Sequence, residues 1–470
     1  MSRNDLTDAL GIKVTIHETK EPDEILADYY PKMWLDDNHT QINENTFALA
    51  YSDCNELRYN NGLFYTRKGK MTEEMIAHEI WESIAEVGIA RNVETTVKKL
   101  VGTVKLAATV PALKTDENII PFGNGDLYIK EWAFHGDSYS PVPYRLRADL
   151  ALELQPTPYF DKWIKDLFEP EDQLVLQEYL GYCMVSSTKA QKALFLLGEG
   201  GAGKSGLGVI LEAILGDAEL NIANTQEFLQ DKFKLPELEH KLVLYDDDLD
   251  GSALTETGLY KKLITNTLSI TADRKYGQPF KFTPRIKLVA CCNKMLSAVY
   301  DNTSGFYRRL LPIVVKPIAQ DFKPDLRFYD RLSQEVEGIV QWALLGLRRL
   351  IDNNWVLSES ERTKSYMTQK QSIDNPLPDF MQSAFDYGEE YSTALTDIMS
   401  VYEYWCRKNN VTAQKPRAVQ LWLADNAEKY HLKRSQNIRA GERYVRGYAG
   451  LQPKAEWVFK DFDGEKIKLL

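Results

Sequence analysis

The chain has 470 residues, of which 44% are hydrophobic, 27% charged and 11% aromatic. This ordinary globular composition excludes a disordered, collagenous or coiled-coil protein, and the length predicts about three domains. The net charge of −11 argues against a nucleic-acid partner, but residues 401–470 break that average with 14 Lys and Arg against 8 Asp and Glu. Such asymmetry is typical of a basic contact module attached to an acidic body.

Cysteine spacing and hydropathy narrow the class of protein further. None of the five cysteines is spaced C-x-x-C, and the six histidines do not cluster with them. We therefore expect neither a disulfide framework nor a structural zinc site. The sequence starts without an apolar run, and no stretch approaches the roughly 18 apolar residues that span a bilayer, so we predict a soluble, cytoplasmic protein without a membrane partner.

Residues 1–190 mix short strand-like runs with helical patterns. The Asn60–Gly62 segment predicts a hairpin turn, since Asn and Gly tolerate positive φ. Helical spacing covers 75–87 and 93–100, a proline-punctuated and turn-rich stretch covers 118–158, and one helix is expected over 160–184. The apolar stripe of that last helix consists of Trp163, Leu167, Leu174, Leu176, Tyr179 and Leu180.

From 192 to 316, short apolar runs alternate with helical segments, which is typical of a mostly parallel α/β sheet. A helix is expected over 329–351, a polar and turn-rich stretch over 352–392, helices near 395–409 and 417–430, and strands near 443–448 and 457–470. The expected parts are an N-terminal loading or collar domain (1–115), a connecting helical region (116–190), an ATPase motor (191–351), a linker (352–385) and a C-terminal DNA-binding domain (386–470).

The segment GEGGAGKS at 198–205 matches the phosphate-loop pattern G-x-x-x-x-G-K-[ST] at every fixed position, with an apolar strand before it and a helix after it. Glycines let backbone N–H groups wrap a phosphate, Lys204 reaches the β- and γ-phosphates, and the Ser205 hydroxyl ligates Mg²⁺. A glycine-rich turn that binds nothing is the alternative. The expected ATP-binding residues are Gly198, Gly200, Gly201, Ala202, Gly203, Lys204 and Ser205.

A second apolar strand, 241–245, ends in three aspartates. In a phosphate-loop ATPase one carboxylate at such a strand end holds Mg²⁺ through water and a neighbour polarises the attacking water. We assign Asp246 to the metal side and Asp247 to the water. A solvated acidic turn, which Asp248 and Asp250 are expected to form, is the alternative.

Two further polar features follow the acidic strand. The strand 285–292 ends in Asn293, which would lie against the γ-phosphate if that strand ran between the other two; otherwise it is a turn or cap residue. Arg308 and Arg309 follow at a loop end. In an oligomeric ATPase one such arginine can reach the neighbour's nucleotide, although both could simply bind surface carboxylates.

The order of these motifs, with 269–282 (SITADRKYGQPFKF) between them, resembles the superfamily 3 helicase core, and more narrowly the primase–helicases of phages, poxviruses and phage satellites. Segments 119–127 and 177–182 also resemble that family, and the resemblance is specific over 117–316. It implies an AAA+-like motor that forms a ring, usually a hexamer, and translocates on single-stranded DNA, typically 3′ to 5′. It also implies that 269–282 is a hairpin in the ring's pore.

The residues of that hairpin suit strand tracking. Cations for phosphates alternate there with aromatic faces for bases. The candidate contacts are Arg274, Lys275, Tyr276 and Lys281, with Lys275 the best of them, and Phe280 and Phe282 nearby. An edge hairpin whose aromatic residues pack inward is the alternative. Many relatives have Glu where Asp247 stands, which leaves the division of roles between Asp246 and Asp247 open.

The ends of the chain carry less specific signals. The basic tail is expected to fold as a winged helix: a helix, a second helix with Trp422 and Leu423 facing inward, and then a hairpin. A solvated face or a subunit contact is the alternative to duplex or origin DNA. Its candidate DNA contacts are Lys433, Arg434, Arg439, Arg443 and Arg446. Relatives often carry a primase at the N-terminus, but Asp36, Asp37 and His39 lack a strand-like context, so a collar is favoured.

Together these patterns predict an α/β fold with a phosphate-loop AAA+-like motor, a mixed α+β N-terminal region and a C-terminal winged helix. The predicted function is that of an ATP- and Mg²⁺-dependent replicative DNA helicase of a phage or mobile element, acting in the host cytoplasm with partners such as a primase or polymerase. Lys204, Ser205, Asp246, Asp247 and Asn293 would act in cis, and Arg308 or Arg309 in trans. The alternative is a sequence-specific initiator whose ATPase switches its assembly on DNA, and a small-molecule phosphotransferase ranks third.

Overall fold

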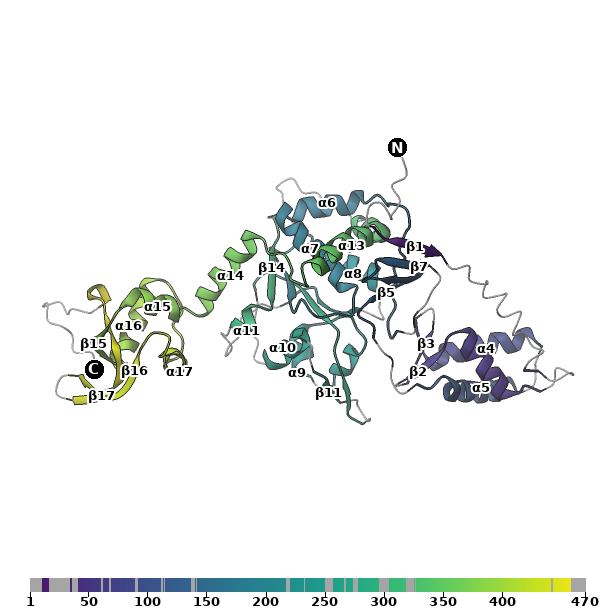
Figure 1. Cartoon of the computed structure of the whole chain (residues 1–470), viewed down its shortest axis with the longest axis horizontal. Helices are drawn as coiled ribbons and strands as arrows, with labels where there is room; N and C mark the ends of the chain where they lie inside the picture. The colour runs from purple at the N-terminus through teal and green to yellow at the C-terminus, as the bar shows by residue number, and fades with distance from the viewer. Residues whose placement is uncertain are drawn as a thin grey trace. The chain divides into compact units, whose positions relative to one another are not determined.

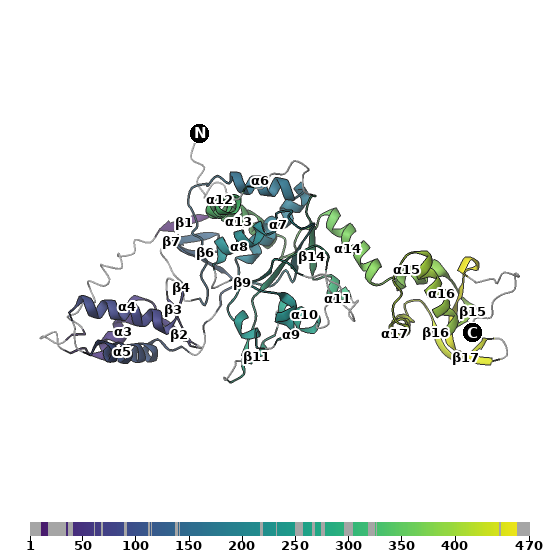
Figure 2. The same ribbon diagram turned by 180° about the vertical axis from the view of Figure 1, so that it is seen from behind.

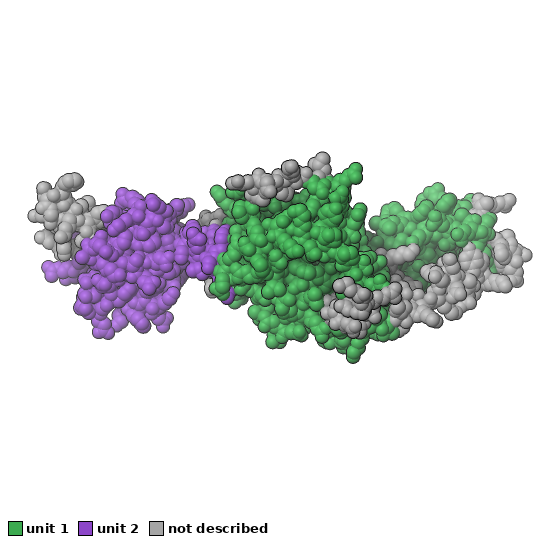
Figure 3. Space-filling view, turned by 90° about the horizontal axis from the view of Figure 1, so that it is seen from above, with its two compact units in different colours: residues 1–363 green, residues 364–470 purple. Residues whose placement is uncertain are grey.

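The protein forms two compact units, residues 1–363 and 364–470 (Figure 3). Both mix helices with sheets, and the described residues form five separate sheets. No helix among them is long and apolar enough to cross a bilayer. The computed structural model describes residues 11–16, 34–35, 41–60, 62–66, 69–88, 92–110, 113, 115–136, 140, 142–216, 220–231, 233–249, 257–265, 268–273, 278–295, 304–317, 325, 327–440 and 443–457.

The N-terminal part of unit 1 has a hydrophobic core of its own, between three helices and a small antiparallel sheet. Ile76, Ile80 and Ile84 are buried along one face because residues four apart stack on a helix. The hairpin and the two helices expected here are confirmed, while Asp36, Asp37 and His39 lie outside the described residues. The elements are α3 (Glu44–Cys54), β2 (Arg58–Asn60), β3 (Leu63–Thr66), β4 (Gly69–Met71), α4 (Glu73–Glu86) and α5 (Val93–Ala108).

A four-stranded sheet follows, in the order β1-β7-β6-β5. The expectation of irregular structure over 118–158 is wrong for 119–136, because strands of four residues are too short to show a hydrophobic period. Asp126 of β6 forms a buried ion pair of 3.1 Å with Arg145, which lies outside the strands of this sheet. The strands are β1 (Lys13–Ile16), β5 (Ile119–Phe122), β6 (Gly125–Tyr128) and β7 (Ala133–Gly136).

The expected helix over 160–184 is two helices, α6 (Pro158–Leu167) and α7 (Pro170–Cys183). Phe168 and Glu169 are both extended between the two helices, and Pro170 begins the second one. Proline lacks an N–H for a helix interior and disfavours helical backbone in the residue before it, which here is Glu169. The break also turns Leu174 outward, and its side chain is 50% exposed instead of lying in the apolar stripe.

Two glycines let α7 pack closely against α13 (Val336–Asp352). A Cβ on Gly346 would lie 2.3 Å from the backbone of Gln177, and one on Gly181 would lie 2.5 Å from the carbonyl oxygen of Ala343. Figures 1 and 2 both show α13 beside α7 and α8. This helical layer covers the largest hydrophobic core of the protein.

The centre of unit 1 is a parallel five-stranded sheet in the order β14-β8-β13-β10-β9. The α/β pattern expected over 192–316 is therefore confirmed. Because all neighbours are parallel, the carboxyl ends of the strands meet at one edge. The strands are β8 (Ala193–Leu197), β9 (Leu220–Ile222), β10 (Val243–Asp246), β13 (Lys287–Cys292) and β14 (Leu310–Val314). The helices are α8 (Gly206–Leu215), α9 (Thr225–Gln230), η2 (Leu235–Leu238), α10 (Thr257–Thr265), α11 (Ser304–Tyr307) and α12 (Phe328–Gln334).

A short antiparallel hairpin, β11 (Ile270–Ala272) and β12 (Phe280–Phe282), lies between β10 and β13 in the chain. Figure 1 shows it at the lower edge of unit 1. The sequence from 269 to 282 was expected to form this hairpin, and the pairing of Thr271 with Lys281 supports that register. Residues 274–277 lie outside the described ones.

Unit 2 has its own core and an antiparallel sheet in the order β15-β17-β16. Residues 352–392 are not the expected turn-rich stretch, since α14 and α15 are helical. The strand expected near 457–470 falls largely outside the described residues, and the hairpin is instead formed by β16 and β17. The elements are α14 (Glu361–Asp374), α15 (Leu377–Ala384), β15 (Phe385–Ala394), α16 (Leu395–Lys408), α17 (Pro416–Asn426), β16 (Lys433–Ala440), β17 (Arg443–Pro453) and η3 (Ala455–Trp457).

The close packing of α7 on α13 yields a stability prediction. Gly346→Ala should lower the free energy of unfolding by about 2 kcal/mol or more, because the added methyl meets backbone that cannot move aside. The matched control is Gly102→Ala in α5, where the new methyl has no neighbour within 4 Å and the gain in helix propensity should stabilise by about 0.5–1 kcal/mol. Thermal unfolding of both variants checks this, and equal midpoints would contradict it.

Candidate active site

The candidate site lies where the strands β8, β13 and β10 end. β13 pairs with β8 on one side and β10 on the other, so the strand that leads to Asn293 runs between the other two, as the sequence analysis required. The loop 198–205 leaves β8 at this edge and enters α8. Its first residue is tied to the middle strand, since the N–H of Gly198 donates to the carbonyl of Cys292 at 3.2 Å.

The backbone of the loop 198–205 depends on its glycines. Gly201 and Gly203 have φ of +81° and +89°, a region that residues with a Cβ rarely adopt. Gly198 passes so close to β14 that a Cβ would lie 2.3 Å from Cγ2 of Val315. The ten-residue helix α8 follows directly, so its free N–H groups and the positive end of its dipole face the loop.

Lys204 places its charge inside the loop. Its side chain is 8% exposed, and Nζ donates to the carbonyl oxygens of Gly198 and Glu199, each at 2.8 Å. The side-chain oxygen of Asn293 lies 3.5 Å from the same nitrogen. The ammonium group therefore lies between the loop and the tip of β13, where it would face the phosphates of a bound nucleotide.

Asp246 and Asp247 lie in different surroundings at the end of β10, and Asp247 is the one beside Ser205. The hydroxyl of Ser205 donates to Oδ2 of Asp247 at 3.0 Å, and both residues are exposed at the sheet edge. Asp246 is 4% exposed and its Oδ2 accepts from the N–H of Thr225 at 2.7 Å. The structure thus brings Asp247, rather than Asp246, to the residue expected to ligate Mg²⁺.

Burial explains the state of Asp246. Desolvation raises the pKa of its carboxyl, and the hydrogen bond from the N–H of Thr225 partly offsets that rise. Consecutive residues at a strand end point to opposite faces, so only one of the two aspartates can face Ser205. Because β10 is buried on both faces, its hydrophobic pattern gave no indication of which one.

Two residues of the site were missed by the sequence analysis. The hydroxyl of Tyr245 donates to Oδ1 of Asp247 at 2.5 Å, and burial raises the pKa of this tyrosine far above its ordinary value, so the phenol remains a donor. The indole N–H of Trp163 donates to the carbonyl of Gly203 at 2.9 Å. In the sequence both residues fit the spacing of buried apolar positions, and no feature distinguished them from other aromatic residues of the core.

The paired arginines have different environments. Arg308 is exposed, whereas Arg309 is 8% exposed and its guanidinium donates to the carbonyl of Gly305. Only Arg308 is therefore placed to reach another molecule.

The hairpin presents one expected cation and keeps one aromatic inward. Lys281 is exposed at the centre of β12, while Phe282 is 8% exposed. Phe280 stacks on Phe282 with ring centroids 5.7 Å apart. The other expected contacts, Arg274, Lys275 and Tyr276, lie outside the described residues.

The five candidate DNA contacts of unit 2 lie on one hairpin, and all five are exposed. β16 carries three and β17 carries two: Lys433, Arg434, Arg439, Arg443 and Arg446. Leu423 is buried in the core of the unit and Trp422 is half-buried, so the inward placement is confirmed for Leu423 and partial for Trp422.

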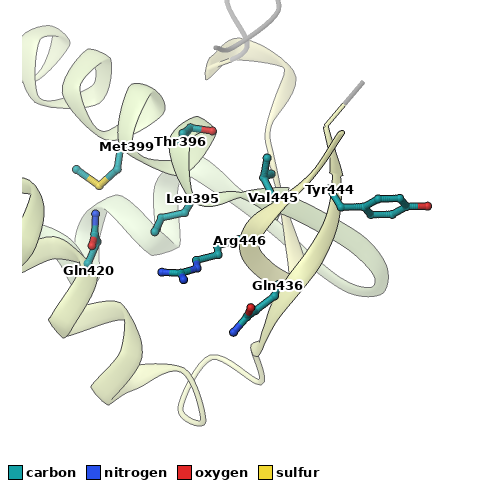
Figure 4. A pocket seen from close by; sticks show the side chains of 8 residues that line it. All are labelled: Leu395, Thr396, Met399, Gln420, Gln436, Tyr444, Val445 and Arg446. Carbon is teal, nitrogen blue, oxygen red and sulfur yellow. The ribbon is translucent and has the colours of Figure 1, made fainter. Parts of the chain in front are cut away.

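A groove of about 730 Å³ lies between this hairpin and the helices α16 and α17. Its walls are Leu395, Thr396, Met399, Gln420, Gln436, Tyr444, Val445 and Arg446. In Figure 4 the polar ends of Gln420 and Arg446 point into the same space, while the ring of Tyr444 points away. The groove thus combines an apolar wall with amide and guanidinium groups.

Comparisons with known proteins identify no function directly. A model of a family of unknown function, DUF5906, matches residues 196–309, about a quarter of the chain, from β8 to the paired arginines. No curated protein matches.

Solved structures of the C-terminal region of NrS-1 are similar to this chain at low identity. An A-form apo structure has a TM-score of 0.45 and 11% identity, and covers 83% of this chain and 93% of its own. A second A-form structure (305–718) has a TM-score of 0.45 and 10% identity, with coverages of 84% and 96%. A further apo structure (305–718) has a TM-score of 0.48 and 11% identity, with coverages of 87% and 99%.

The placement of the two aspartates yields a prediction about metal binding. Asp247→Asn should weaken the Mg²⁺-dependent part of ATP binding by about 10- to 100-fold, because the oxygen beside Ser205 loses its charge. Asp246→Asn should keep affinity close to that of the parent protein, since an amide oxygen can still accept from Thr225. Calorimetric titration of ATP with and without Mg²⁺ measures the affinity of both variants. A larger loss of Mg²⁺-dependent affinity in Asp246→Asn than in Asp247→Asn would show that Asp246 holds the metal, as the sequence predicted.

Proposed function

We propose that this chain is an ATP-hydrolysing motor that acts on DNA in replication. The observation that carries the proposal is the meeting of Lys204, the Ser205–Asp247 pair and Asn293 at one edge of a parallel sheet. These are the groups that phosphoryl transfer needs, because its catalysis is mainly positioning and charge stabilisation.

The residues present fit Mg²⁺, which takes oxygen ligands and is usually held by one or two protein groups together with substrate phosphates. Ser205 and Asp247 offer two such oxygens side by side. When bound, the ion neutralises charge on the phosphates. Lys204 would bind the β- and γ-phosphates, Asn293 would position water against the γ-phosphate, and the loop amides would orient the nucleotide.

The motor is best described as AAA+-like, of the superfamily 3 type, acting as a ring, usually a hexamer. The position of β13 between the phosphate-loop strand and the acidic strand supports this assignment. In a ring, Arg308 would supply positive charge to the neighbour's ATP, because it is exposed while Arg309 is held in its own subunit.

Two surfaces support DNA as the substrate. Lys281 on the β11–β12 hairpin suits contact with single-stranded DNA in the pore. Unit 2, with its order of helix, strand, two helices and a hairpin, supports a winged helix whose exposed cations would contact duplex phosphates. A replicative helicase of a phage or mobile element, moving 3′ to 5′ in the host cytoplasm, uses both surfaces.

A sequence-specific initiator is the second candidate, and the groove of unit 2 favours it. Gln and Arg are the side chains that pair bidentately with adenine and guanine edges, and Gln420, Gln436 and Arg446 line the groove together. Deleting residues 364–470 separates the two functions. A helicase should still unwind a preformed fork, whereas an initiator should lose all activity.

Lys204→Ala should abolish ATP hydrolysis and strand displacement, with a loss of at least about 1000-fold in kcat, because the charge facing the phosphates is removed. Lys98→Ala, which removes an exposed lysine that pairs with Glu94 of the same helix α5, is the control and should retain both activities. Phosphate release measures ATP hydrolysis and a forked-duplex assay measures unwinding. Full unwinding by the Lys204→Ala variant would contradict the proposal.

Within unit 2, Arg446→Ala should lower discrimination between DNA sequences by about 1–3 kcal/mol if Arg446 reads a base edge. Lys433→Ala should instead weaken binding to all duplexes alike and reduce the salt slope by about one, since an exposed lysine contacts phosphate. Fluorescence anisotropy over a range of salt concentrations distinguishes them. Unchanged duplex binding by both variants would exclude this surface.

A further inference from the structure

Four side chains from three segments of unit 1 form a continuous chain of polar contacts at the candidate site. Ser205 donates to Oδ2 of Asp247 at 3.0 Å, and Tyr245 donates to Oδ1 of the same carboxylate at 2.5 Å. The Tyr245 oxygen lies 3.4 Å from Sγ of Cys291 on the neighbouring strand. Both oxygens of Asp247 therefore have a defined partner.

Strand geometry puts Tyr245 and Asp247 on the same side. Side chains two residues apart in extended backbone face the same way, and Asp246 between them faces the opposite way, toward Thr225. The tyrosine thus lies beneath the carboxylate, between it and the core.

The position of the Tyr245 ring is fixed by the helix that follows the phosphate loop. Tyr245 is 3% exposed, and its ring packs where Gly208 of α8 has no side chain. A Cβ on Gly208 would lie 2.5 Å from Cε1 of the ring. Because Ser205 is the N-cap residue of the same helix, three residues before Gly208, the ring and the serine hydroxyl are held at a set separation.

This arrangement restricts an otherwise mobile carboxylate. Asp247 is exposed, and an exposed aspartate is free to rotate about its side-chain bonds. With Oδ1 held by a buried phenol, only Oδ2 remains for Ser205 and for a ligand between them. Groups that orient a metal-binding carboxylate in this way commonly change metal affinity 10- to 100-fold when they are removed.

We propose that Tyr245 is a positioning residue for phosphoryl transfer, which holds Asp247 so that Oδ2 faces the Mg²⁺ side of the site. The inference rests on the proposed function and adds to it a residue outside the phosphate-loop and acidic motifs. It assigns the tyrosine hydroxyl to orientation of Asp247, whereas the ring alone would suffice for packing.

The test is Tyr245→Phe in the full chain, which keeps the ring against Gly208 and removes only the hydroxyl. The gain in ATP affinity on adding Mg²⁺, measured by calorimetry, should fall about tenfold or more, with ATP affinity in the absence of Mg²⁺ unchanged. The kcat for hydrolysis should fall about 10- to 100-fold with KM little altered, since a hydrogen bond to a charged group is lost.

The matched control is Tyr179→Phe. Tyr179 is buried in the same core, and its hydroxyl bonds to the carbonyls of Lys192 and Leu288. These carbonyls lie at the amino ends of β8 and β13, away from the candidate site at the carboxyl ends. This variant should keep the Mg²⁺-dependent gain, so a general effect of removing a buried hydroxyl is separated from the specific one. Gly208→Ala supplies a second route, because it keeps the hydroxyl but displaces the ring, and it should reduce the same gain.

A double-mutant cycle with Asp247→Asn decides whether Tyr245 acts through that carboxylate. In the Asp247→Asn background, Tyr245→Phe should cause no further loss of Mg²⁺-dependent ATP affinity. Independent, multiplying losses would overturn the inference, as would a Tyr245→Phe variant that behaves as the parent protein does. If the parent protein itself binds and hydrolyses no ATP with Mg²⁺, the proposed function fails and the inference falls with it.

Discussion

The hydrogen bond from Ser205 to Asp247 is the contact on which the candidate site depends. It joins the N-cap residue of α8 to the residue after β10, although β13 lies between β10 and the strand that precedes the loop 198–205. Such a contact is possible only because parallel strands end at a common edge, which brings loops far apart in sequence together. Asn293, at the end of β13, and Lys204, in the same loop as Ser205, complete the cluster. Polar groups confined to this edge leave the sheet itself free to be buried on both faces.

Close packing beneath the sheet edge fixes these groups. Glycines at the α7–α13 crossing and at the contact of α8 with Tyr245 let backbone and ring approach where any methyl would collide. Trp163 adds a hydrogen bond from α6 to the loop at Gly203. Protein interiors packed at this density transmit small displacements, so core residues can control the orientation of exposed ones. The site therefore depends on residues that touch no ligand.

The positive charges of the chain are concentrated at particular places, which the net charge does not show. The whole chain carries −11, yet Lys204 is buried in its loop and the five cations of the unit 2 hairpin are all exposed. A nucleic acid responds to the local field within about a Debye length, roughly 10 Å at moderate salt, so an acidic body does not prevent a basic hairpin from acting. The proposed duplex contact therefore rests on the position of the charge along the chain rather than on its sum.

The sequence by itself determined the phosphate loop, the order of the motifs and the parallel α/β pattern, because these depend on residue types at fixed local spacing. It did not determine which aspartate faces Ser205, because β10 is buried on both faces and shows no alternation of apolar and polar residues from which a facing side could be predicted. Nor did it separate Arg308 from Arg309, or Tyr245 from the other core aromatics. Pro170 could have predicted the break between α6 and α7, but the apolar stripe that runs through both helices favoured a single helix. Only tertiary structure decided these points, since each depends on which neighbour packs against which face.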